Sequence, residues 1–81
     1  MPFEADIRKP CDFTVNINYI RTIFEESEHF EDIQLSDDDF RVVAHNIEAE
    51  VWINLIRGEK FSLPDICFTE LLAFVARSQI V

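Results

Sequence analysis

The sequence predicts a single α+β domain of 81 residues, in which an N-terminal β-hairpin packs on three helices. Apolar and polar residues alternate with a period of two over residues 3–8 and 13–19, which is typical of half-buried strands. Apolar residues recur at spacings of three and four over residues 20–29, 37–57 and 63–80, which indicates helices. A chain of this length forms one small domain, and its 48% hydrophobic content supplies a core.

The hairpin is predicted from two short runs of β-forming residues that a turn containing Pro10 connects. Residues 13–19 place Phe, Val, Ile and Tyr at the odd positions and Thr and Asn at the even ones. An isolated hairpin is marginal in water, so its apolar face needs a helix to lie on. The competing interpretation makes Asn16 or Asn18 the cap of a helix that begins there. The fold is then an all-α three-helix bundle with an irregular N-terminal segment.

The first helix is predicted over residues 20–29, with Ile20, Ile23 and Phe24 directed inward. The next residues lack a regular period. An irregular connection is therefore expected, anchored by the apolar residues Phe30, Ile33 and Leu35.

The helix over residues 37–57 is the predicted centre of the fold. Ser36 is a good N-cap, and Asp39 stands three residues later, as in a capping box. The aspartates at 37–39 place negative charge at the positive end of the helix dipole. Gly58 can adopt the left-handed conformation that ends a helix. The residues that share its predicted buried face are Phe40, Val43, Ala44, Ile47, Val51 and Leu55.

A second apolar set lies roughly opposite that buried face. A helix that is apolar on two sides needs cover on both, and the hairpin or the first helix could supply it. The alternative is that this set is a dimer or partner interface, which would make the protein a homo-oligomerising adaptor or interaction module. The set comprises Val42, Ala49, Trp52, Ile53 and Ile56.

The last helix is predicted over residues 63–80. Ser62 can cap it, with Asp65 at the reciprocal position and Pro64 in the first turn, where proline is tolerated. The link from the central helix is short, which favours antiparallel packing of the two helices. Its inward face is predicted to contain Phe68, Leu71, Leu72 and Val75.

Negative charge is concentrated in one stretch of the chain. The formal net charge is −9, from sixteen acidic and seven basic residues. Residues 25–39 contain eight of the sixteen acids and no Lys or Arg, so the remainder is nearly neutral. Glutamates in the last turns of a helix repel one another and the dipole. The eight acids are Glu25, Glu26, Glu28, Glu31, Asp32, Asp37, Asp38 and Asp39.

This acidic stretch predicts a non-enzymatic binding protein, an inhibitor that engages a basic, nucleic-acid-binding surface of a partner protein. Carboxylates spaced along a surface can imitate phosphates and accelerate encounter with a basic groove. Phage DNA-mimic inhibitors and nuclease immunity proteins work in this way, and the likeness is one of composition, without a shared motif. Direct nucleic-acid binding is disfavoured because phosphates would be repelled. The bland alternative is a solvated face that serves solubility.

Other chemistry has little support in the sequence. Three consecutive aspartates without the required Gly and Glu do not match an EF-hand loop, and neither His29 nor His45 has zinc-ligand spacing to a cysteine. There is no nucleophile-elbow motif or phosphate-binding glycine loop, so we expect no enzyme activity, metal or cofactor. Two distant cysteines, Cys11 and Cys67, favour reduced thiols and a cytoplasmic location. No apolar run is long enough to span a membrane.

Overall fold

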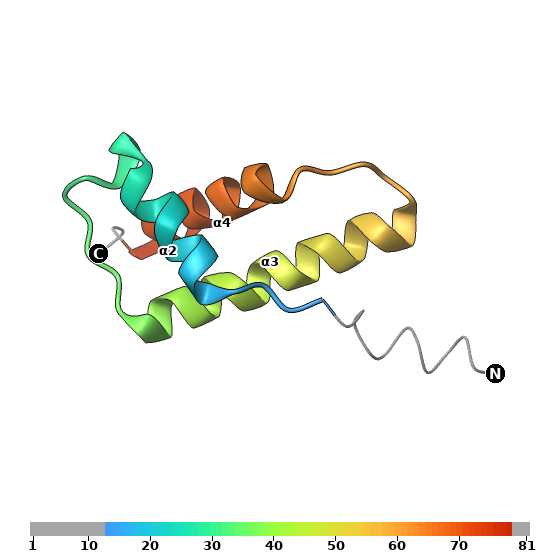
Figure 1. Ribbon diagram of the computed structural model, residues 1–81, viewed down its shortest axis with the longest axis horizontal. Coiled ribbons are helices and arrows are strands. Elements are labelled where there is room, and N and C mark those ends of the chain that lie inside the picture. The colour runs from blue at the N-terminus through green and yellow to red at the C-terminus, as the bar shows by residue number, and fades with distance from the viewer. Residues whose placement is uncertain (1–12, 79–81) are drawn as a thin grey trace.

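The computed structural model describes residues 13–78, which fold entirely as helices and connections (Figure 1). The elements are α2 (Ile17–Glu26), the 3-10 turn η1 (Glu28–Phe30), α3 (Asp37–Arg57) and α4 (Leu63–Ser78). No strand occurs within these residues, so the predicted α+β class is wrong and the all-helical alternative fits. The predicted strand at 3–8 lies outside the described residues.

The predicted strand at 13–19 is wrong because a helix begins inside it. Asn16 has an extended backbone, and its side-chain oxygen accepts a hydrogen bond from the N–H of Asn18 at 2.8 Å. This is the N-cap of α2, as the competing interpretation required. Ile20 and Phe24 are buried one helical turn apart, with Ile17 packed against the same core. The apolar residues that alternate with a period of two at the end of this stretch therefore also belong to the buried face of a helix.

The first helix also ends earlier than the predicted residue 29. Ser27 has an extended backbone with ψ of 131°, which interrupts α2 after Glu26. The Ser27 side chain then accepts a hydrogen bond from the N–H of His29 at 3.2 Å and caps the short turn η1. This turn brings Phe30 back into the core, where it is 3% exposed.

The central helix and both of its ends are confirmed. The Ser36 hydroxyl accepts a hydrogen bond from the Asp39 N–H, and the Asp39 carboxylate accepts one from the Ser36 N–H, which completes the capping box. At the other end Gly58 has φ of 68°, and its N–H bonds to the carbonyls of Asn54 and Leu55. A left-handed glycine of this kind ends α3 after Arg57.

Helix α4 runs antiparallel to α3, as the short link predicted (Figure 1). The Ser62 hydroxyl accepts a hydrogen bond from the Asp65 N–H at 3.4 Å, so Ser62 acts at the predicted cap position. The described part of α4 ends at Ser78, and the last two residues of the predicted 63–80 helix lie outside it.

The core lies where α2 crosses the pair formed by α3 and α4. Five of the six residues on the predicted inner face of α3 are buried, whereas Leu55 is 52% exposed. Leu55 lies in the last turn of α3, which extends beyond α2 (Figure 1). The buried residues are Val15, Ile20, Phe24, Phe30, Phe40, Val43, Ala44, Ile47, Val51, Cys67 and Leu71.

The second apolar set of α3 has no cover among the described residues. Val42 is 47% exposed, Ile53 is 36% exposed and Ile56 is 61% exposed. Ala49 is exposed as well, and Trp52 is half-buried. The expectation that a hairpin or the first helix would cover this side is therefore not met by residues 13–78. None of the helices in this part of the chain is both long and apolar enough to cross a bilayer.

Candidate functional site

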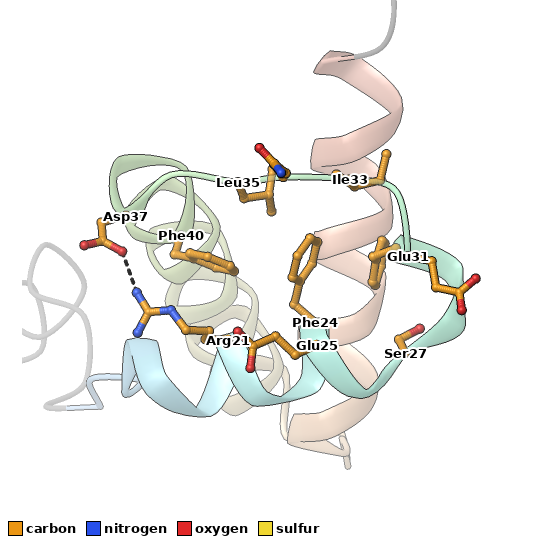
Figure 2. Close-up of a pocket in the computed structure, with 11 residues that line it drawn as sticks. Arg21, Phe24, Glu25, Ser27, Glu31, Ile33, Leu35, Asp37 and Phe40 are labelled. Atoms are coloured by element: carbon orange, nitrogen blue, oxygen red, sulfur yellow. Dashed lines mark hydrogen bonds and ion pairs between the residues drawn. The ribbon is translucent and has the colours of Figure 1, made fainter.

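A pocket of about 560 Å³ opens between α2, the connection that follows η1, and the start of α3 (Figure 2). Its apolar lining comprises Phe24, Phe30, Ile33, Leu35 and Phe40. Its polar lining comprises Arg21, Glu25, Ser27, Glu31, Gln34 and Asp37. We call this the acidic pocket, because three of its polar residues belong to the acidic stretch predicted to bind a partner.

Three phenylalanines form the floor of the acidic pocket. The rings of Phe24 and Phe30 are stacked, with centroids 5.0 Å apart and planes 16° apart. The rings of Phe24 and Phe40 meet edge to face, with centroids 5.5 Å apart. All three side chains are at least 92% buried. The floor therefore belongs to the core and is held in place before any ligand arrives.

The local turn at Ser27 and η1 explains how this floor forms. In an uninterrupted helix, residues 24 and 30 would point to different sides of the helix. The 3-10 turn instead folds Phe30 against Phe24. The Ile33 N–H then donates to the Phe30 carbonyl at 3.0 Å, which closes a further turn. The chain passes over the rings through Ile33 and Leu35 (Figure 2).

An arginine closes one end of the acidic pocket. Its guanidinium, on Arg21, donates to the Asp37 carboxylate at 2.5 Å and to the Asn18 side-chain oxygen at 2.7 Å. The guanidinium carbon also lies 5.2 Å from the centre of the Phe40 ring, within range of a cation–π contact. The Arg21 side chain thus links α2 to the start of α3 (Figure 2).

The remaining carboxylates of the pocket stand at its edges. Glu31 lies at the side opposite Asp37, and Glu25 lies on α2 between them (Figure 2). Both glutamates are exposed, and neither forms an ion pair with any residue between 13 and 78. The side chain of Glu31 points outward, away from the phenyl rings (Figure 2). These two carboxylates give the apolar pocket a negative rim.

The other predicted partner-binding acids lie away from the pocket. Glu26 and Glu28 border a separate shallow hollow beside His29. Asp38 pairs with Arg41 at 2.5 Å, and Asp39 is engaged in the capping box. Asp32 is exposed and lines neither hollow. The structure thus brings together Glu25, Glu31 and Asp37, and divides the predicted acidic face into parts with different surroundings.

Sequence reasoning missed the aromatic floor as part of a site. Phe24 and Phe40 were predicted as core residues, and Phe30 as an anchor of the connection, from their apolar character alone. No periodicity links Arg21 to Asp37, because the two residues are 16 positions apart and meet only through tertiary packing. The available signal was one phenylalanine within the acidic stretch, Phe30, and one at each of its borders, Phe24 and Phe40.

The other titratable side chains of the described residues form no metal-ligand cluster. Between residues 13 and 78, no three His, Cys, Asp or Glu side chains converge as metal ligands would. Burial raises the pKa of the Cys67 thiol to about 11, so at neutral pH this free cysteine is protonated and unreactive. Partial burial, and then the charge of Glu50, raise the pKa of Glu70, while Arg77 lowers it.

Comparison of the chain with protein-family profiles, curated proteins and solved structures found no match in any of the three.

Proposed function

We propose that this chain is a non-enzymatic binding protein whose acidic pocket receives a basic side chain from the nucleic-acid-binding surface of a partner protein. The observation that carries the proposal is the combination of a buried aromatic floor with the carboxylates of Glu25 and Glu31 at its edge, which pair with no residue between 13 and 78. Acidic character alone would equally suit a solvated surface. An apolar floor beneath the charges adds a place for a side chain to bind.

A lysine or arginine matches both parts of the acidic pocket. Its aliphatic stem can cover the phenyl rings while its cationic end reaches the carboxylates. A cation near an aromatic face gains about 0.5 to 2 kcal/mol, depending on its exposure to water. Arg21 supports this choice, because its guanidinium already combines a phenylalanine ring with a carboxylate at one end of the same pocket.

The outlying acids have a longer-range role in this proposal. Glu26, Glu28 and Asp32 are exposed and extend the negative field around the pocket. Such a field attracts a basic protein surface and repels nucleic acid. By occupying the partner's basic groove, the chain would exclude nucleic acid and so inhibit the partner, in the manner of DNA-mimic inhibitors. We place this encounter in the cytoplasm, where the buried Cys67 thiol would remain reduced.

The test is displacement of a fluorescent DNA duplex from an arginine-rich peptide, followed by anisotropy. Wild-type protein should capture the peptide and release the DNA, less effectively at 200 mM than at 50 mM salt. The double variant Glu25→Gln, Glu31→Gln should require about tenfold more protein, which is 1.4 kcal/mol from two screened charge contacts.

The matched control is Glu26→Gln, Glu28→Gln, which removes the same charge from the last residue of α2 and the first residue of η1 but leaves the pocket lining intact. It should change the required concentration by less than about threefold, because those charges act only through the screened field. Equal losses in the two double variants would show that only total charge matters, and would exclude the pocket as the binding site. No release of DNA by wild-type protein would reject the proposed function itself.

A further inference from the structure

The outer face of α3 is an uncharged strip on a strongly negative protein. We define this outer face as the seven positions Val42, His45, Asn46, Ala49, Trp52, Ile53 and Ile56. None of the seven is Asp, Glu, Lys or Arg, although the formal net charge of the chain is −9. The neighbouring charged residues of the helix, such as Glu48 and Glu50, fall outside the strip.

The outer face also has the spacing of a helix-pairing seam. Val42, His45, Ala49, Trp52 and Ile56 follow one another at intervals of three, four, three and four residues, as the inward positions of paired helices do. Three large apolar side chains on this face are between 36% and 61% exposed, and no described residue covers them. Exposed apolar residues aligned along one helix indicate a surface that pairs with another.

We infer that the outer face of α3 pairs with the same face of a second copy of this chain, with the two α3 helices antiparallel. The charges at the two ends of α3 support a second copy as the partner, and they also support its antiparallel direction. The helix begins with the aspartates at 37–39, two of which pair with Arg21 and Arg41 but keep exposed carboxylates, and it ends with Arg57, followed by Glu59 and Lys60. The start therefore remains the more acidic end and the finish the more basic one. An antiparallel copy brings each acidic end to a basic end, and it also opposes the two helix dipoles. A parallel copy would place six aspartates together.

The register follows from the size of the residues on the outer face. Ala49 lies midway between Val42 and Ile56 and lets two helices approach closely at a twofold axis. Val42 of one copy then lies beside Ile56 of the other. These ends are 14 residues apart, so the contact extends about 21 Å along each helix. A contact of this length buries less area than a standard stable interface, so the dimer depends on concentration.

Dimer formation and partner binding at the acidic pocket should differ in their dependence on salt concentration. Two copies of a chain with net charge −9 repel each other, and salt screens that repulsion. The exposed side chains that the dimer would bury on the outer face are mainly apolar, and burial of apolar surface does not weaken with salt. Self-association should therefore persist in 1 M NaCl, whereas capture of a basic partner should fail there. Loss of either activity can occur without loss of the other.

The first test is sedimentation velocity from 10 µM to 1 mM protein. Wild-type protein should shift from monomer to dimer, and Ile56→Glu should remain monomeric throughout. Leu55→Glu is the matched control, because Leu55 is also an exposed apolar residue of α3, 52% exposed, but points about 100° away from Ile56. The dissociation constant of its dimer should lie within threefold of the wild-type value. A wild-type monomer at 1 mM, or equal losses in the two variants, would overturn the inference.

The second test fixes the direction by oxidative cross-linking of single cysteines in a Cys11→Ser background. The buried Cys67, with its pKa of about 11, does not compete at neutral pH. Ala49→Cys should cross-link to itself, and Val42→Cys should cross-link only when mixed with Ile56→Cys. Self-linking of Val42→Cys would overturn the antiparallel arrangement. Absence of all three cross-links would assign the outer face to a different occupant.

Discussion

The ring of Phe30 ties the connection between α2 and α3 to the core, so its removal tests both the fold and the pocket. The side chain is 3% exposed, stacks on Phe24 at 5.0 Å and lies 5.7 Å from the Phe68 ring of α4. It therefore joins three parts of the chain at the floor of the acidic pocket. We predict that Phe30→Ala is strongly destabilising.

The size of the effect follows from burial and ring contacts. Truncation withdraws roughly 120 Å² of apolar surface from the core, about 3 kcal/mol at 25 cal/mol per Å². Loss of the stacked pair adds about 0.5 to 1.5 kcal/mol. The expected loss of about 3 to 5 kcal/mol compares with a total stability of about 4 to 12 kcal/mol for 81 residues. The variant should be barely folded at 25 °C.

Urea unfolding followed by far-UV circular dichroism measures this loss. Phe61→Ala is the matched control, because Phe61 lies in the link before α4 and is 40% exposed. Its cost should stay below about 1 kcal/mol, as for most surface substitutions. Phe30→Leu keeps an apolar side chain and should cost about 1 to 2 kcal/mol, which leaves a folded protein to examine. If Phe30→Ala costs less than 1 kcal/mol, the pocket floor is not held in place and the argument for preorganisation fails.

Three further predictions concern the helix start and two titratable groups. Ser36→Ala removes the capping box of α3 and should cost about 1 kcal/mol in urea unfolding. Cys67 in folded protein should react with iodoacetamide at pH 8 at least fiftyfold more slowly than in unfolded protein, by mass spectrometry, because burial raises its pKa to about 11. Its protonated form is favoured by folding, so stability should be intact below pH 9 and fall by about 1 to 3 kcal/mol toward pH 11. Glu70→Gln should raise stability by a few tenths of a kcal/mol at pH 7, since partial burial and Glu50 raise the pKa of this carboxyl, and the gain should vanish below pH 4, where the wild-type carboxyl is also protonated.

Helix α3 could be predicted to the residue because its signals are local. A serine cap, a carboxylate three residues later and a glycine after the last turn act on neighbouring backbone groups. These interactions need no information about the rest of the fold. The same reasoning located the cap and start of α4.

The prediction for the N-terminal part was wrong because a strand-like period and a helical period are both present in one short sequence. Residues 13–19 alternate like a strand, yet Ile17, Ile20 and Phe24 also share a helical face. The Asn16 cap decides between them, and asparagine is common in both turns and caps. A seven-residue window holds too few positions to separate the two patterns.

The acidic pocket could be predicted in composition but not in geometry. The sequence indicated the concentration of charge, whereas the interruption of α2 at Ser27 determines which carboxylates face the same pocket. A one-residue change from helical to extended backbone places Glu31 at the edge of the pocket and leaves Glu26 outside it. The break coincides with the burial of Phe30 against Phe24 and Phe68, and such long-range packing lies beyond local sequence rules.

The two proposed surfaces can operate together because they use different sides of the chain. The acidic pocket lies between α2 and the start of α3, and the outer face lies on the side of α3 turned away from the core. In an antiparallel pair the two starts of α3 lie at opposite ends of the contact, so the two pockets are separated along it. A partner with basic residues repeated along a groove would then meet two pockets at once, which raises apparent affinity without any new contact. Ile56→Glu should therefore weaken capture of a long arginine-rich peptide while leaving binding of a single-site peptide unchanged. Equal binding of both peptides by this variant and wild type would show that the pockets act singly.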